Sequence, residues 1–235
     1  MVNLAPVIWL AIFASRSSRQ RRVPPQVECA LDRLELDSCI READLACASL
    51  NPDDLTRDVI LARKGLALAL EGSYQEATLV LDSVRIDLLP QEERFRFFSG
   101  RIFAWLLASR TDAARDVVEV DLPRIDRTLV LPPLRERMRL AQAAFRAAEG
   151  EGATQRATLE RVARRGWRPL HRVLAHIFVS RLDVEEGHTQ AAIAHLEAAA
   201  RLGPETVATS MHRSLKARQA SSDGSRWQGD AGAVS

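Results

Sequence analysis

Cysteine is scarce in this chain, with three residues among 235. Cys29, Cys39 and Cys47 are odd in number and form no CxxC pair. Neither a disulfide framework nor a zinc site built on cysteine is therefore expected. Free cysteines pack as small hydrophobic side chains, so we expect these three to be buried on helices.

Histidine is also scarce, with five residues. His188 and His195 are seven positions apart, so they can share one face of a helix. A metal site needs further ligands and supporting hydrogen bonds, which spacing alone does not supply. We therefore expect ordinary surface or groove histidines, with no metal and no cofactor.

The common catalytic signatures are missing as well. The sequence contains no GxxxxGK[ST], HExxH or GxSxG motif and no Gly-rich loop after a strand, so the main nucleotide-binding, zinc-protease and hydrolase signatures are absent. We predict that the chain is not an enzyme. Basic and acidic residues nearly cancel, leaving a net charge of +2. A nucleic-acid-binding protein normally has a basic excess on one face, so no nucleic acid is expected as a partner.

Aromatic residues make up only 5% of the chain, and β-branched residues are few and scattered. Leu and Ala dominate instead, which favours helices over strands. With 46% apolar residues, 235 residues can bury a core of ordinary size. The composition predicts an all-α protein whose helical part forms one domain.

The most informative stretch is residues 61–90, which holds two short helical patterns separated by a turn at Gly72. Apolar and small residues recur at spacings of three and four on each side of the turn. Gly65 and Ala77 lie where two antiparallel helices must approach closely. Neither helix can bury its apolar stripe alone, so the unit requires similar neighbours.

This stretch resembles the tetratricopeptide repeat (TPR) family, whose motif is about 34 residues long. The residues at the family's offsets are Leu61, Gly65, Leu68, Gly72, Tyr74, Ala77, Leu81 and Val84, with Pro90 one place late. A second copy near the end matches at Gly187, Ala192, Leu196, Ala199 and Pro204. Between them, turns at Gly72, Ser109, Gly152 and Gly187 give steps of about 37, 43 and 35 residues.

The resemblance covers residues 27–204 and is sharp at these two copies. It implies an α-solenoid of antiparallel helix pairs, coiled into a right-handed superhelix. It also implies a concave groove that holds a protein or peptide.

The chain divides into three parts. Residues 1–25 hold an apolar run, MVNLAPVIWLAIFA, and an Arg-rich linker that ends in two prolines. Residues 26–219 hold the TPR-like helical repeats. Residues 220–235 are rich in Ser, Gly, Asp and Ala, which predicts a disordered tail.

The apolar run at residues 1–14 has three interpretations. The first is a membrane anchor, because the arginines that follow it would keep the repeats in the cytoplasm, tethered to the inner membrane of a bacterium. The run is shorter than the roughly twenty residues that span a bilayer, so it would insert shallowly or span a thinned membrane. The second is a cleavable signal peptide, which normally carries positive charge before the run. The third is a helix packed on the repeats, or an extension from a misplaced start codon.

In the TPR family the first helix of each pair lines the groove. With the turn residues as anchors, that pattern selects Arg96, Ser99, Arg139, Gln142, Arg146, Ile177 and Arg181 as the partner-binding residues. Guanidinium groups hold carboxylates through paired hydrogen bonds, so such a groove suits an acidic or C-terminal peptide.

The sequence therefore predicts a non-catalytic scaffold that holds a partner protein or peptide in its groove. The alternative is a regulatory or sensory module that binds a small anionic ligand in the same hollow. A third, weaker alternative is RNA binding along the Arg faces.

Overall fold

The computed structural model describes residues 24–124 and 132–230, and within these ranges every regular element is helical. The predicted all-α class is therefore confirmed. The composition explains it, since Leu and Ala lose little side-chain freedom in a helix. Cys39 is fully buried, as predicted, but Cys47 is half-buried and Cys29 is exposed.

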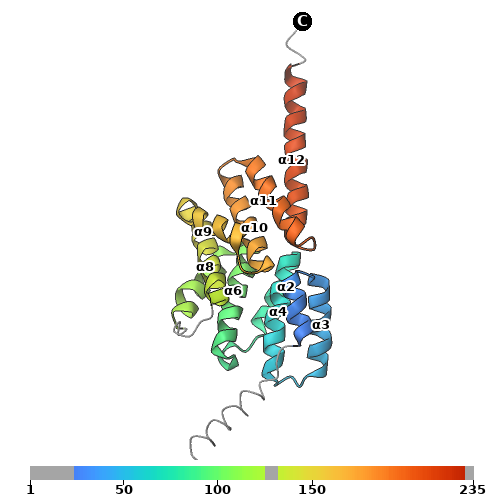
Figure 1. Cartoon of the computed structure of the whole chain (residues 1–235), viewed down its shortest axis with the longest axis vertical. Helices are drawn as coiled ribbons and strands as arrows, with labels where there is room; N and C mark the ends of the chain where they lie inside the picture. Colours follow the sequence, from blue (N-terminus) through green and yellow to red (C-terminus); the bar gives the residue numbers. More distant parts are fainter. Residues whose placement is uncertain (1–23, 125–131, 231–235) are drawn as a thin grey trace, which may run out of the picture.

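The described residues form five antiparallel helix pairs and one further helix (Figure 1). The pairs are α2 (Pro25–Arg33) with α3 (Leu36–Ser49), α4 (Leu55–Glu71) with α5 (Tyr74–Asp82), α6 (Gln91–Leu107) with α7 (Thr111–Asp116), α8 (Pro132–Arg146) with α9 (Gly152–Arg165), and α10 (Pro169–Glu185) with α11 (Thr189–Leu202). The last helix is α12 (Val207–Asp230). Short 3₁₀ turns lie at Ile86–Leu88 and Leu122–Arg124, and π-helical turns at Val117–Asp121 and Ala147–Glu151.

The chain reverses direction inside every pair at a residue with a positive φ. These residues are Leu34, Gly72, Ser109, Gly150 and Gly187. Positive φ is the left-handed conformation that commonly ends a helix, and glycine adopts it without steric cost. The turns recur roughly every 37 to 41 residues, which is longer than the TPR repeat of about 34. Those predicted at Gly72, Ser109 and Gly187 are confirmed. The one predicted at Gly152 is wrong by two residues, because Gly150 makes the turn and Gly152 begins α9.

The predicted close approach of α4 and α5 is also confirmed. A Cβ atom added to Gly65 would lie 2.6 Å from Leu81 Cγ, which is closer than real Cβ contacts. Gly65 therefore lets Leu81 pack directly on the backbone of α4. Ala77, the other small residue predicted at this contact, is 1% exposed.

The first helices of the pairs contact one another in order: α2 with α4, α4 with α6, α6 with α8 and α8 with α10. α10 also contacts α2, so this row of helices closes on itself. Across the interior, the rings of Phe103 and Phe178 are 6.2 Å apart, and both side chains are buried. An open groove along the first helices does not form among the described residues, because their inner faces pack into one core.

The two ends of the chain differ from the sequence analysis. α12 continues to Asp230, whereas a disordered tail is predicted from residue 220. It packs on α11 and extends away from the body of the molecule (Figure 1). Residues 1–14, the subject of the anchor hypothesis, lie outside the described residues. Among the helices that are described, none is long and apolar enough to cross a membrane.

Candidate anion-binding site

Two of the predicted groove residues are buried. Ile177 has no exposed surface, and Ser99 is 1% exposed. Ser99 Oγ donates a hydrogen bond to the carbonyl of Arg96 at 3.0 Å and accepts one from Arg137 Nε at 2.8 Å. Both residues lie on first helices that pack into the closed core, so neither can contact a partner, and their assignment to the groove is wrong.

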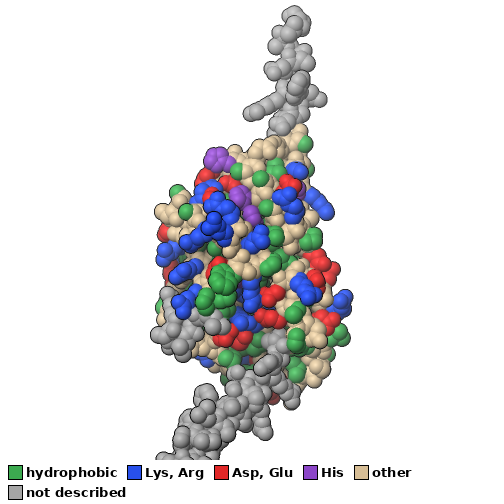
Figure 2. Space-filling model, in the orientation of Figure 1, with side chains coloured by type: hydrophobic (Ala, Val, Ile, Leu, Met, Phe, Trp, Pro, Cys, Tyr) green, Lys and Arg blue, Asp and Glu red, His purple; other side chains and the backbone are tan. Residues whose placement is uncertain are grey.

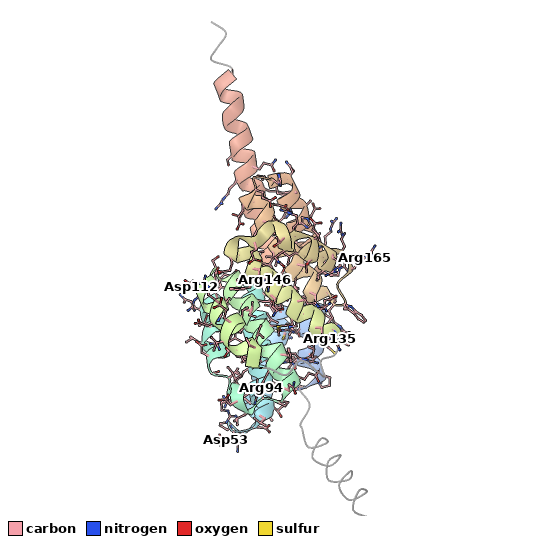
Figure 3. All side chains as sticks on the ribbon, turned by 90° about the vertical axis from the view of Figure 1, so that its left-hand side faces the viewer. Asp53, Arg94, Asp112, Arg135, Arg146 and Arg165 are labelled. Atoms are coloured by element: carbon pink, nitrogen blue, oxygen red, sulfur yellow. The ribbon has the colours of Figure 1, made fainter. Side chains whose placement is uncertain are left out.

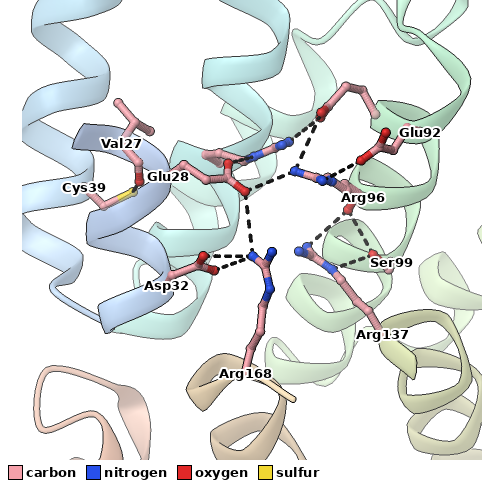
Figure 4. Close-up of polar contacts among 11 residues, drawn as sticks. Val27, Glu28, Asp32, Cys39, Glu92, Arg96, Ser99, Arg137 and Arg168 are labelled. Atoms are coloured by element: carbon pink, nitrogen blue, oxygen red, sulfur yellow. Dashed lines mark hydrogen bonds and ion pairs between the residues drawn. The ribbon is translucent and has the colours of Figure 1, made fainter. Parts of the chain in front are cut away.

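Arg96 belongs to a network of charged side chains centred on Glu28 of α2 (Figure 4). The Glu28 carboxylate accepts from Arg63 Nε at 3.0 Å and from Arg96 Nη1 at 3.1 Å, and Arg168 Nη1 lies 3.9 Å from it. Burial opposes the ionisation of Glu28, but Arg63 and then Arg96 lower its pKa below the ordinary value. Arg96 Nη2 also pairs with Glu92 at 2.6 Å, so both terminal nitrogens of its guanidinium are used within the fold.

Arg137 of α8 lies in the same network but has no carboxylate partner among the described residues. Its guanidinium donates to Ser99 Oγ at 2.8 Å and to the carbonyl of Arg96 at 3.2 Å. Burial, followed by the charges of Arg63 and Arg96, lowers its pKa to about 9. Arg137 is therefore still charged at neutral pH, and this buried positive charge is compensated by these hydrogen bonds and by the nearby charge of Glu28, without a direct ion pair.

Arg181 of α10 is used inside the fold as well. Its guanidinium donates to the carbonyls of Leu106 and Leu107, which lie at the end of α6. These carbonyls have no partner within their own helix, so Arg181 caps α6. Of the predicted groove residues, Arg96, Ser99, Ile177 and Arg181 thus hold first helices together.

The remaining three, Arg139, Gln142 and Arg146, lie on one stripe of α8 that faces outward. Arg139 and Arg146 are exposed, and Gln142 is half-buried. Arg135 extends the stripe by one turn, and Figure 3 shows Arg135 and Arg146 on the side that faces the viewer. These residues lie on an outer surface, so their assignment to a partner-binding site stays a prediction.

Arg139 lines a pocket of about 380 Å³ between α8 and α9. The pocket is lined by Pro132, Arg135, Glu136, Arg139, Thr158, Arg161, Val162, Arg165 and Trp167. We call the group Arg135, Arg139, Arg161, Arg165 and Trp167 the arginine pocket. Two arginines come from α8 and two from α9, each pair four residues apart, so each pair projects from one helix face.

Glu136 fixes one wall of the pocket. Its carboxylate accepts from the backbone N–H of Trp167 at 2.9 Å and lies 2.7 Å from His171 Nδ1. Burial lowers the pKa of His171 despite the opposing effect of Glu136, so the imidazole is neutral at pH 7 and donates from Nδ1. The same carboxylate oxygen, Glu136 Oε1, accepts from both donors. The indole of Trp167 is left on the surface, 69% exposed.

The arginine pocket carries more positive charge than its surroundings neutralise. Among the described residues, no carboxylate forms an ion pair with Arg139, Arg161 or Arg165. Figure 2 shows basic side chains gathered over α8, α9 and α10, and Figure 3 places Arg165 near this region. Like charges this close repel one another, and a bound anion would relieve that repulsion.

The sequence analysis missed Arg135, Arg161, Arg165 and Trp167. It carried over the positions that the TPR family uses, all of which lie on first helices, whereas half of this pocket comes from a second helix, α9. The i, i+4 spacing of the arginines on both helices was a readable signal. Nothing in the sequence indicates that these two helices face each other across a pocket.

The fold and the site define an all-helical protein of five antiparallel pairs, with a basic pocket on the outside of the fourth pair. Comparison of the chain with protein-family models, with curated proteins and with solved structures finds no match to any of them.

Proposed function

We propose that this protein is a non-catalytic scaffold that binds an acidic partner protein at the arginine pocket. The observation that carries the proposal is the set of exposed guanidinium groups, Arg139, Arg161 and Arg165, that have no carboxylate partner among the described residues. Guanidinium groups bind carboxylates in bidentate pairs, and two facing rows suit a segment with several acidic residues.

Trp167 supports a protein partner. An exposed tryptophan beside charged residues is a common anchor of protein interfaces, where Trp and Arg contribute much of the binding energy. The backbone of Trp167 is held by Glu136, so the indole is presented in a defined place. An acidic segment with an apolar residue next to its carboxylates would use both parts of the pocket.

The repeat architecture supports the same function. The five helix pairs among the described residues, with turns at a regular spacing, favour a TPR-like superhelix with repeats longer than usual, curled tightly enough for α2 and α10 to meet. Such folds present rigid helical surfaces to other proteins. The proposal keeps the protein in the cytoplasm, with residues 1–14 as a tether to the inner membrane.

Fluorescence anisotropy with a labelled Glu-rich peptide tests the proposal. Arg139→Glu combined with Arg165→Glu should weaken binding at least tenfold, because it replaces two attractions with two repulsions. Arg41→Glu combined with Arg213→Glu is the matched control, since it makes the same change of net charge and both arginines are exposed, on α3 and α12, outside the lining of the pocket. It should change the affinity by less than twofold. Equal losses in both variants would point to net charge and count against the pocket.

A small anionic ligand is the second candidate, because the pocket is concave and large enough for one. A thermal-shift series with citrate and phosphate distinguishes it, since a ligand of the native state raises the melting temperature. A shift at micromolar citrate with no peptide binding would favour the small ligand. Tighter binding of a single-stranded RNA oligomer, with a steep salt dependence, would favour nucleic acid instead.

A further inference from the structure

A second cluster of side chains lies at the turn between α10 and α11, away from the lining of the arginine pocket. Asp183, Glu186 and His188 each offer a ligand atom, and these atoms lie within 4.8 Å of one another. His195 of α11 adds a fourth group, with Nε2 at 3.9 Å from Asp183 Oδ2. Histidine side chains are visible over this part of the molecule in Figure 2.

Asp183 is the buried member of this cluster, with 2% of its surface exposed. Its Oδ1 accepts from Arg156 Nη1 at 2.7 Å, but its Oδ2 has no hydrogen-bond partner. A buried carboxylate oxygen without a partner is costly, so such an atom requires a physical explanation. Oδ2 faces His195, whose Nε2 atom lies 3.9 Å away.

The contact with the neighbouring His176 bears on which ring nitrogen of His195 carries the proton. His176 Nδ1 lies 2.9 Å from Nδ1 of His195, so one of these two atoms donates to the other. We take the tautomer in which His195 donates from Nδ1 and His176 accepts. The Nε2 atom of His195 then carries a lone pair, which points to the unpartnered oxygen of Asp183.

Two acceptors that face each other without a donor between them leave room for a cation. We propose that Asp183 Oδ2, His195 Nε2, His188 and Glu186 bind a Zn²⁺ ion. Two imidazoles and two carboxylates are a ligand set that zinc accepts, at bond lengths of about 2.0 to 2.2 Å. His176 serves as the outer partner that fixes the tautomer of His195, as is usual for metal-bound histidines.

Arg156 does not block this site. Its guanidinium pairs with Asp183 Oδ1 and with Glu186 Oε2, each at 2.7 Å. The second oxygen of each carboxylate is then available to the ion. His188 is 64% exposed and Glu186 40%, so both can turn onto the ion from the solvent side. A zinc site goes beyond the proposed scaffold function, and it differs from the sequence analysis, which predicts no metal.

Titration calorimetry with ZnCl₂ on the full chain, purified without a histidine tag, tests the site. We expect one ion per chain, bound at micromolar concentration or tighter, with a rise in melting temperature that MgCl₂ does not produce. His188→Ala should weaken zinc binding at least tenfold without harming the fold, because His188 is exposed. His195→Gln should do the same.

His212→Ala is the matched control, since it removes a histidine of α12 outside the cluster and should leave the zinc affinity unchanged. The proposal is overturned if the wild-type chain binds zinc only at millimolar concentration. It is also overturned if His212→Ala weakens binding as much as His188→Ala does.

Discussion

Glu28 and Arg137 belong to one charged network, but they differ in what their removal leaves behind. Glu28 is the carboxylate on which Arg63 and Arg96 converge, at 3.0 and 3.1 Å. Removing a partner from a buried ion pair strands the remaining charges, which costs more than the pair itself contributes. Arg137 has no carboxylate to strand. The charge of Glu28 therefore stabilises the fold, whereas the charge of Arg137 destabilises it.

Glu28→Gln should destabilise the protein by about 2 to 3 kcal/mol at pH 7, since it leaves Arg63 buried without one of its two carboxylates. The pKa of Glu28 is lowered in the folded protein, so its contribution is fully present above the unfolded value near 4.5. That contribution disappears as the pH falls through the folded pKa. Urea unfolding from pH 3 to 8 should show a deficit that is largest at neutral pH and shrinks in acid.

Arg137→Met is the comparison variant, and its effect should stay within about 1 kcal/mol at pH 7. It removes hydrogen bonds to Ser99 and Arg96, but it also removes a desolvated charge that Arg63 and Arg96 repel. A large loss of stability in this variant, or a deficit of Glu28→Gln that persists at pH 3, would contradict our account of the network.

The individual helix pairs are what the sequence specifies best. Gly65 and Ala77 mark a close helix contact, and Gly72 and Gly187 mark left-handed turns, because these constraints act between residues near in sequence. The fourth turn was displaced by two residues because Gly150 and Gly152 are both available and only one adopts a positive φ. Local steric rules identify such a region but do not choose between neighbouring glycines.

Gly65→Ala should destabilise the protein by about 1 to 3 kcal/mol, despite alanine's better helix propensity. The new methyl group would meet Leu81 Cγ and Cδ2 at 2.6 Å, and Leu81 is itself buried, so it cannot move into solvent. Thermal or urea unfolding measures the effect. In the double variant Gly65→Ala with Leu81→Ala the methyl group has space, so the combined loss should be smaller than the sum of the single losses. Additive losses would show that α4 and α5 do not meet at this point.

How the pairs are placed relative to one another could not be read from the sequence. The TPR resemblance implied an open superhelix, and its groove positions at Ser99 and Ile177 proved to be core. The reason lies in long-range contacts, such as the ring of Phe103 on that of Phe178, which join helices far apart in the chain. The same closure moved the accessible basic surface to the outside, where α9 contributes half of the arginine pocket. Arg139 is exposed, and its role in binding a partner stays a prediction.

A closed row of helices should also unfold differently from an open one. In an open solenoid each pair contacts only its neighbours, so the terminal pairs fray independently. Here α2 contacts α10, and the contact includes an ion pair in which Arg168 Nη1 donates to both oxygens of Asp32, at 2.7 and 2.8 Å. The first and fifth pairs then protect each other, although they are distant in sequence.

Asp32→Asn should therefore speed amide hydrogen exchange in α2 and in α10 together, by roughly two- to fivefold, the effect of losing about 0.5 to 1 kcal/mol from a half-exposed ion pair. Exchange measured by mass spectrometry resolves the two helices. Asp82→Asn is the matched control, because the ion pair of Asp82 with Arg101 at 2.8 Å joins α5 to α6, which belong to neighbouring pairs. Its effect should stay near those helices. Faster exchange in α2 alone after Asp32→Asn would mean that the two ends touch without stabilising each other, and the molecule would then behave as an open stack.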